Sequence, residues 1–528
     1  MQQQTSFRVA KDVLKTRQAW FWIGLVGLFI GSAVFRFWGL ARFNVLVYDE
    51  FYFAKFANYY LTSTPFLDGH PPLGKYLIAL GIWLSQFNPF GYSVRTTVPE
   101  FGFDLPTVSY RWMNALVGSG IPVLVALLAY QLSHRYRYAL IAGLLTALDG
   151  LLLVESRYAL INIYLLTFGL LGQIFFLVAL SRPEKAQRNR WLLAAGIGFG
   201  ASMSVKWTGL GFLLGLYVLW GIVQGANARS RQLLLSQQPS SPSTGSGSAT
   251  LPAASLPYIK AVSPSSPQPK TEAMMGSVLV SHPLRQLGRL HWRDLLFYLG
   301  VIPGFVYSLI WLPHIHHDPR HSLLGYQKQL YTWHTSISGQ AHSYCAPWYN
   351  WPWLGRSRPY YIDQIDLTTG TDAGKIMYQY VSGMGNPFLW WQSAIAIVLV
   401  AGVALWTLPK ILARGTAQAQ SFDALGWTTG GTALYILLSY LANLLPWAAI
   451  SRCSIIYHYM PASLFSFLAL AWVMDRVLES KDAWKEAIVG LLVCLIVFGF
   501  FFWLPLFWGL PLTPDGLEAR VWFKFWSW

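Results

Sequence analysis

The feature that most constrains this chain is a series of apolar segments, most of them close to the length of a membrane-spanning helix. A helix needs about 20 predominantly apolar residues to cross the hydrocarbon core of a bilayer. Of the 528 residues, 54% are hydrophobic and only 11% are charged, which is too apolar for a soluble domain. The sequence therefore predicts an all-α polytopic membrane protein with about 11 transmembrane helices. The expected spans are residues 20–40, 111–132, 139–154, 159–180, 191–205, 208–224, 294–312, 388–408, 426–449, 455–475 and 486–511.

Basic residues set the expected orientation, because Lys and Arg accumulate in cytoplasmic loops. The clearest cluster is RPEKAQRNR at residues 182–190, and placing it inside makes the N-terminus cytoplasmic and the C-terminus extracytoplasmic. The net charge of +16 then needs no nucleic-acid partner, and the sequence has no RNA-binding motif. The basic start is followed by an apolar segment without a small-residue cleavage pattern, which predicts a retained first helix rather than a signal peptide.

The expected spans divide the chain into segments of different composition. Residues 226–293 form a cytoplasmic linker whose Ser, Pro and Gly content predicts that it is mostly disordered. Residues 76–87 are apolar but too short to cross a bilayer, so we expect an interfacial or re-entrant helix there. The other segments are an N-terminus (1–19), a membrane region (20–225) with an extracytoplasmic loop (41–110), one transmembrane helix (294–312), an aromatic-rich extracytoplasmic loop (313–387), C-terminal membrane helices (388–511) and an extracytoplasmic tail (512–528).

Residues 47–75, VYDEFYFAKFANYYLTSTPFLDGHPPLGK, hold an unusual density of polar groups just after the first span. Asp49 and Glu50 begin an aromatic run that predicts a helix, and the helix N-terminus would favour their ionised forms. His70 is followed by two prolines, so the chain should leave that helix and begin another near Lys75.

Further ionisable residues lie near the ends of the expected spans, mostly on the extracytoplasmic side. Any one of them is explained by a side chain that reaches from the span to water, but together they predict a site. Cations of such a set can bind a phosphate group, and a carboxylate can act as a base on an incoming hydroxyl. This chemistry describes a transferase that uses a lipid phosphate, since the sequence lacks the glycine motifs that bind nucleotides. These residues are Arg111, Asp149, Glu155, Arg157, Lys206, Arg452 and His458.

The histidines and cysteines of the chain raise two further questions, a metal site and a disulfide. The densest cluster of metal-ligand residue types is His314, His316, His317, Asp318 and His321, but its spacing matches no standard zinc pattern. We therefore expect no metal and no cofactor. Cys345 and Cys453 are both extracytoplasmic in the expected topology and could either pair or remain reduced, whereas Cys494 lies in a span.

Six motifs, in order and spacing, resemble the protein O-mannosyltransferases. They are residues 47–75 above, YRWMNALVG at 110–118, the DG and LVESRYALIN region at 149–162, SVKWTG at 204–209, GNPFLWW at 385–391 and YHYMPA at 457–462. The resemblance implies a membrane glycosyltransferase of the GT-C type with an extracytoplasmic active site. It also implies inverting transfer of mannose from a polyprenyl phosphate or dolichyl phosphate to Ser or Thr hydroxyls of secreted or membrane proteins. The expected partners are this donor, a polypeptide acceptor at the protein translocon, and membrane lipids.

The resemblance also assigns roles to residues of this sequence. It implies that Asp49 is the catalytic base with Glu50 beside it. The residues assigned to the donor phosphate are Arg111, His70, Lys75, Arg157 and Lys206, and those assigned to support are Asp68, Lys55, Glu155, Arg452 and His458.

Two departures from the family pattern affect what is expected. Eukaryotic members carry a large β-trefoil insert where this chain has only the loop 313–387, which points to a bacterial plasma membrane. Asn162 stands where the family usually has an Asp, so its role is left open.

The sequence is also compatible with other functions. A related GT-C enzyme could use another lipid-linked sugar or a lipid or glycan acceptor, and the sequence separates these only through the motifs. A subunit without activity is a further alternative. A transporter is disfavoured, because transporters typically show internal repeats and charges near the midplane, whereas here the charges gather at one face.

Overall fold

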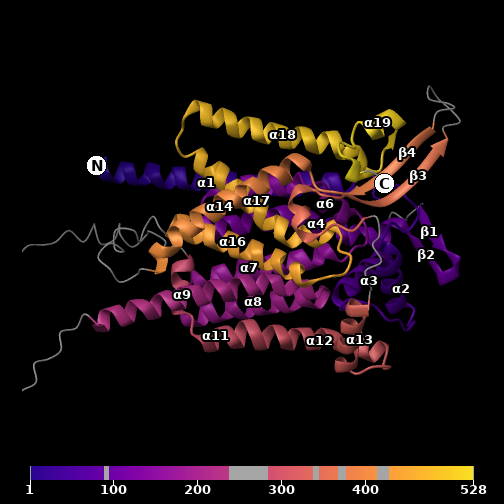
Figure 1. The fold of residues 1–528 in the computed structure, drawn as a ribbon, viewed down its shortest axis with the longest axis horizontal. Helices are drawn as coiled ribbons and strands as arrows, with labels where there is room; N and C mark the ends of the chain where they lie inside the picture. Colours follow the sequence, from indigo (N-terminus) through magenta and orange to yellow (C-terminus); the bar gives the residue numbers. More distant parts are fainter. Residues whose placement is uncertain are drawn as a thin grey trace, which may run out of the picture.

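Long apolar helices lie side by side along one axis in the computed structural model (Figure 1). The structure describes residues 2–87, 94–236, 283–336, 344–366, 376–412 and 427–526. Within these ranges nine helical segments are long and apolar enough to cross a membrane, and ten if one bent pair is counted as a span. The nine are α1 (Gln2–Phe37), α4 (Thr107–Ser133), α7 (Asn162–Leu180), α9 (Leu210–Ser236), α11 with α12 (Trp292–Leu296 and Ile302–His317), α14 (Pro387–Leu412), α16 (Thr432–Leu444), α17 (Met460–Val477) and α18 (Ala483–Trp508).

The bent pair corrects the straight span expected at residues 139–154. It consists of α5 (Tyr136–Ala147) and α6 (Gly150–Arg157), which meet at 62°. The carboxylate of Asp149 accepts a hydrogen bond from the backbone N–H of Leu152 and so caps α6 as a separate helix.

A further helix, α8 (Lys185–Val205), covers the span expected at residues 191–205. It packs between α7 and α12, but the charges of its first turns lower its hydropathy, and it is not among the nine. The count of about 11 spans therefore stays a prediction.

Close helix packing explains two glycines of α7 and α8. A Cβ added to Gly198 would lie 2.9 Å from the backbone nitrogen of Gly172, so the absence of side chains lets the two helices approach. The helix α17 lies inside the bundle against α5, α14 and α16, and its side chains are almost all buried. An apolar surface on all sides is typical of such a fully buried helix.

Shorter elements gather at one end of the bundle, which we call the loop end (Figure 1). They include two small antiparallel sheets, so the all-α prediction missed short strands that lie between the spans. The helix α3 is apolar but short, as expected for a segment that does not cross the membrane. The elements of the loop end are α2 (Glu50–Leu61), α3 (Leu73–Ser85), α13 (Leu323–Ser336), α19 (Pro514–Glu518), the hairpin of β1 (Arg95–Val98) and β2 (Phe103–Pro106), and the sheet of β3 (Arg358–Asp366), β4 (Ile376–Gly383) and β5 (Pro511–Leu512).

The expected linker at residues 226–293 is too long at both ends. The helix α9 continues to Ser236, and a short 3₁₀ helix at Pro283–Arg289 packs against α7 and α9 with Leu284 and Leu287 fully buried. Residues 237–282 lie outside the described residues. The loop expected at 313–387 likewise begins later, because α12 continues to His317.

Candidate active site

Asp49 lies at the loop end, immediately before the first residue of α2. Its carboxylate makes no capping hydrogen bond to that helix. Burial raises the pKa of Asp49 to about 6, against the opposing positive charges of Lys206 and Arg358. Desolvation therefore outweighs the effects that favour the charged form, although a carboxyl with this pKa is still mostly ionised at pH 7. A carboxyl whose pKa lies close to neutral pH is suited to general base catalysis.

The turn before Asp49 is held in an uncommon backbone conformation. Tyr48 has a φ of 53°, a region that costs a residue other than Gly about 1–3 kcal/mol. Its ring stacks on that of Tyr360 with centroids 4.3 Å apart, and the guanidinium of Arg358 lies 5.1 Å from the Tyr48 ring. Side chains from β3 therefore help to fix the position of Asp49.

Glu50, the residue after Asp49, is completely buried and is paired with Arg111. The Arg111 Nε donates to Glu50 Oε1 at 2.9 Å, and the Arg111 Nη2 donates to Oε2 at 2.7 Å. The remaining N–H groups of Arg111 donate to the carbonyl oxygens of Leu40, Phe43 and Val45. This geometry leaves no N–H of Arg111 for a ligand, so the expected contact with a donor phosphate is corrected to a structural role.

Two further cations assigned to the phosphate also point elsewhere. Lys75 is buried, forms an ion pair with Asp68 and donates to the carbonyl of His70 at 2.8 Å. Arg157 donates to four backbone carbonyls at and just after the end of α1, including that of Trp38 at 2.6 Å. Both side chains therefore hold loops in place, and their assignment to the donor phosphate stays a prediction.

A polar network connects Lys206 to strand β3 of the three-stranded sheet. The Lys206 Nζ donates to Asn162 Oδ1 at 2.8 Å, and the Asn162 amide donates to Glu155 Oε2 at 3.0 Å. The hydroxyl of Tyr360 donates to the other oxygen of Glu155 at 2.5 Å. Asn162 thus joins a cation to a carboxylate without adding a second negative charge beside Glu155.

Lys206 also lines a cavity of about 850 Å³ that has two chemically different ends. The polar end holds His70, Lys206, His334, Arg452 and His458. No ion pair of Arg452 is present within the described ranges, so its positive charge is available to a ligand. The apolar part is lined by Leu210, Leu213, Leu214 and Tyr217 of α9, by Leu299 just before α12 and by Pro303 in its first turn.

Burial controls the charge at the polar end. It lowers the pKa of Lys206 to about 8, with the carboxylates of Glu155 and Asp49 opposing the effect. It also lowers the pKa of His70 well below its usual range, so that side chain is neutral at pH 7. Lys206 and Arg452 are therefore the cations that an anionic group would meet here.

The other predicted residues lie outside this cavity. The Lys55 Nζ lies 4.4 Å from the Phe51 ring and 4.2 Å from the Phe101 ring. Among the histidines, His314 hydrogen-bonds the Tyr60 hydroxyl at 2.7 Å and His317 contacts the Thr64 carbonyl at 3.0 Å. Within the described ranges, no group of three His, Cys, Asp or Glu side chains is placed to hold a metal ion.

Sequence reasoning missed Tyr360 and Arg358, which contact the turn at Asp49. They lie in the segment PWYNWPWLGRSRPYY, which stands out in the sequence only by its aromatic content, because β3 joins the site through folding and not through sequence spacing. The question of the cysteines is settled by a disulfide between Cys345 and Cys453, with Cα atoms 5.1 Å apart.

Comparison with known proteins gives consistent matches along the chain. A mannosyltransferase of Mycolicibacterium smegmatis, named polyprenol-phosphate-mannose–protein mannosyltransferase, is 24% identical over 488 residues, covering 87% of this chain and 81% of its own. The dolichyl-phosphate-mannose–protein mannosyltransferase 6 of Saccharomyces cerevisiae is 30% identical over 223 residues, covering 41% of this chain and 28% of its own. The solved S. cerevisiae Pmt1-Pmt2 complex bound to the sugar donor superposes with a TM-score of 0.67 at 15% identity, covering 96% of this chain and 93% of that chain. That superposition shows the GT-C fold.

Two family models divide the chain between them. Residues 320–526 match the C-terminal four TMM region of protein-O-mannosyltransferase. Residues 26–317, more than half of the chain, match the model described as dolichyl-phosphate-mannose-protein mannosyltransferase. This chain therefore belongs to the dolichyl-phosphate-mannose-protein mannosyltransferase family of glycosyltransferases.

Proposed function

We propose that this chain transfers mannose from polyprenyl-phosphate mannose to a Ser or Thr hydroxyl of a polypeptide, with Asp49 as the general base. The observation that carries the proposal is the relation of Asp49 to the 850 Å³ cavity. Lys206, which lines the polar end of that cavity, lies with its Nζ 4.9 Å from the Tyr457 ring, and that ring lies 6.3 Å from the ring of Tyr48, the residue before Asp49. A base is thus available beside a site that has both cationic and apolar parts.

The cavity fits the two parts of a lipid phosphate. From Leu210 to Tyr217 the helix α9 rises by about 10 Å, which provides an apolar wall along which a polyprenyl chain can lie. Lys206 and Arg452 provide positive charge at the polar end for the phosphate. We assign the donor phosphate to these two residues, with His70 and His458 as neutral neighbours.

The proposed reaction is a single displacement that inverts the anomeric carbon. Asp49 accepts the proton of the acceptor hydroxyl while its oxygen bonds to C1 of mannose, and the bond from C1 to the phosphate oxygen breaks. The leaving polyprenyl phosphate carries the electron pair away as a dianion, which Lys206 and Arg452 stabilise. Glu50 acts indirectly, because its pairing with Arg111 fixes the start of α2.

A bacterial plasma membrane is supported by the mycobacterial relative, which matches along most of its length. We propose that the loop end faces the extracytoplasmic side, where a polypeptide leaving the translocon would meet it. We expect the reaction to need no metal or organic cofactor, because the cations of the protein face the phosphate.

The test uses membranes that contain the full chain, labelled polyprenyl-phosphate mannose and a peptide rich in Ser and Thr. We expect label on the peptide, inverted anomeric configuration and a loss of about 10²–10⁴-fold in rate for Asp49→Asn. Asp104→Asn is the matched control, because Asp104 is an exposed carboxylate of the β1–β2 hairpin. Full activity of Asp49→Asn would refute the mechanism. Transfer of another sugar, or of mannose only to a lipid or glycan, would favour a different GT-C activity.

A further inference from the structure

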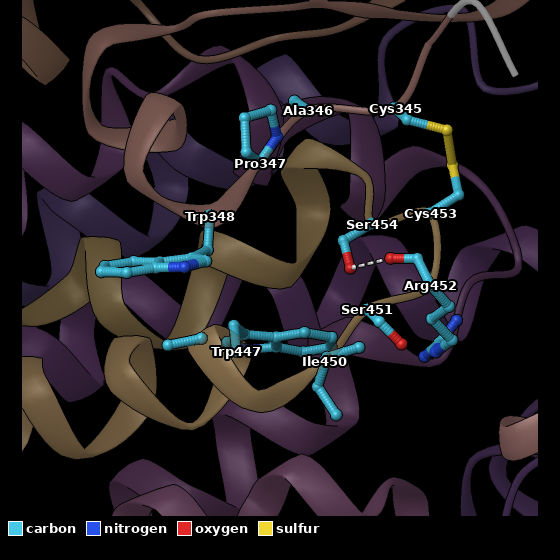
Figure 2. A pocket seen from close by; sticks show the side chains of 11 residues that line it. Cys345, Ala346, Pro347, Trp348, Trp447, Ile450, Ser451, Arg452, Cys453 and Ser454 are labelled. Carbon is cyan, nitrogen blue, oxygen red and sulfur yellow. Dashed lines mark hydrogen bonds between the residues drawn. A yellow bond between two sulfur atoms is a disulfide. The ribbon is translucent and has the colours of Figure 1, made fainter. Parts of the chain in front are cut away.

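A second cavity, of about 320 Å³, lies between two loop segments that are far apart in sequence. One wall comes from residues 345–348 and the other from residues 447–454. The disulfide Cys345–Cys453 joins the walls, and the backbone N–H of Ala346 donates to the carbonyl of Ser454 at 2.9 Å. Figure 2 shows the rings of Trp348 and Trp447 on one side, with Arg452 and the disulfide on the other.

This cavity borders the donor cavity. Trp447, Ile450 and Arg452 line both. The Trp447 ring lies 4.2 Å, centroid to centroid, from the ring of His458, which also lines the donor cavity. A single layer of side chains therefore separates an occupant of the second cavity from the polar end where the donor phosphate is assigned.

We propose that the cavity between residues 345–348 and 447–454 is the docking site of the acceptor polypeptide. The inference rests on the proposed function, because it takes the 850 Å³ cavity to be filled by the donor. The acceptor hydroxyl must then reach Asp49 from another direction. The second cavity lies near the base, because the guanidinium of Arg358 is 4.4 Å from the ring of Tyr344, which precedes Cys345, and 5.1 Å from the ring of Tyr48, which precedes Asp49.

The chemistry of the walls favours an extended peptide that contains proline. Trp348, Trp447, Pro347 and Ile450 form flat apolar surfaces, and aromatic grooves of this kind bind proline-rich segments whose extended conformation is already formed. Ser451 also lines the cavity, and its hydroxyl provides a hydrogen-bonding group for a peptide backbone. A volume of about 320 Å³ suits a few residues of peptide and not a polyprenyl chain.

The first experiment separates the two substrates by kinetics on the full chain in membranes. Peptide concentration is varied at saturating polyprenyl-phosphate mannose, and then the donor is varied at saturating peptide. The probe is a ten-residue synthetic peptide with Ser, Thr and Pro. We expect Trp348→Ala to raise the KM for the peptide about tenfold, which corresponds to a typical loss at a buried aromatic contact. The KM for the donor should be unchanged, because Trp348 does not line the donor cavity.

Two variants control for a general effect on the fold. Trp353→Ala removes an exposed indole from the same 3₁₀ helix (Trp348–Trp353) outside the cavity, and it should leave both KM values unchanged. Trp348→Phe retains an aromatic wall and should keep most of the affinity for the peptide. A rise in the donor KM with Trp348→Ala, or an unchanged peptide KM, would overturn the inference.

A second experiment does not depend on turnover. A benzophenone derivative of the peptide is photocrosslinked to the Asp49→Asn variant, and the adduct is mapped by mass spectrometry. We expect adducts within residues 345–348 or 447–454 that disappear with an excess of unlabelled peptide. Adducts only elsewhere, or no specific adduct at these segments, would overturn the docking site. If the unmodified enzyme transfers mannose to no peptide, the proposed function fails, whereas transfer with normal kinetics in Trp348→Ala refutes this inference alone.

Discussion

Arg111 of α4 and Glu50 of α2 form a two-point ion pair in which neither side chain is exposed. The same carboxylate accepts hydrogen bonds from the backbone N–H groups of Val47 and Ala159, each at 2.8 Å. Glu50 therefore joins the loop after α1, the start of α2 and the segment after α6. Asp49 is adjacent to this junction, so its position depends on the pair.

The first prediction concerns Arg111→Ala. The substitution leaves the Glu50 carboxylate buried and unpaired, and loss of one partner of a buried pair typically costs about 3–5 kcal/mol. We expect a lower unfolding temperature and a lower yield of folded protein, with loss of transfer as a consequence. Thermal unfolding of the purified protein in detergent measures the effect.

Arg95→Ala is the matched control for Arg111→Ala, because Arg95 pairs with Asp104 at the surface. Exposed pairs contribute about 0–1 kcal/mol, so this variant should unfold like the unmodified protein. If Arg111→Ala kept normal stability and only raised the KM for the donor, the structural role assigned to Arg111 would be wrong.

The second prediction concerns the pH dependence of kcat/KM. The base form of Asp49 exists above its pKa of about 6, and the charged form of Lys206 exists below its pKa of about 8. Transfer should therefore rise as the pH rises through about 6 and fall as the pH passes about 8. Initial rates at low substrate between pH 5 and pH 9.5 measure both limbs.

Lys206→Arg tests the origin of the alkaline limb. Arginine stays protonated throughout this range, so the variant should retain the acid limb and lose the alkaline one. A profile that is flat across pH 6, or an alkaline limb that persists in Lys206→Arg, would contradict the assigned groups.

The third prediction concerns the stability of Asp49→Asn. The folded protein raises the pKa of Asp49 from 3.8 to about 6, so its stabilising contribution is present below about pH 3.8 and is lost as the pH rises through 6. At pH 7 the buried carboxylate therefore opposes folding, and Asn does not. We expect Asp49→Asn to unfold at an equal or higher temperature at pH 7, with a smaller difference at pH 4.5. A clearly lower unfolding temperature at pH 7 would show that the carboxylate supports the fold.

The sequence correctly predicts a polytopic membrane protein, because each apolar span is one continuous stretch of sequence that can be recognised by its length. In the structure His70, Lys206, Arg452 and His458 line one cavity, although the first lies in the loop 41–110 and the others near the ends of later spans. The DG pair at residues 149–150 is a local signal for the bend between α5 and α6. The residues on both sides of it are apolar, however, and so the sequence predicts one straight span.

The partner of each buried charge could not be predicted, because the pairs are far apart in sequence. Arg111 is 61 residues from Glu50, and Tyr360 is 205 residues from Glu155. A lone cation at the end of a span has the same local sequence whether it faces a cavity or a cluster of backbone carbonyls. Only the path of the loop at residues 40–45 decides that Arg111 faces inward.

The last prediction concerns the disulfide between Cys345 and Cys453, which closes a loop of 108 residues. Closing a loop of this length restricts the unfolded chain and stabilises the folded state by roughly 4–5 kcal/mol in the chain-entropy model. A membrane-permeant reductant should therefore lower the unfolding temperature. The Cys345→Ala/Cys453→Ala double variant should unfold at that lower temperature with or without reductant.

Thiol labelling checks the same disulfide, with Cys494 as an internal reference because it is the free cysteine. The denatured, unreduced protein should take one maleimide, and all three cysteines should react after reduction. Labelling of three thiols before reduction would contradict the disulfide and remove the covalent link between the two walls of the proposed acceptor site.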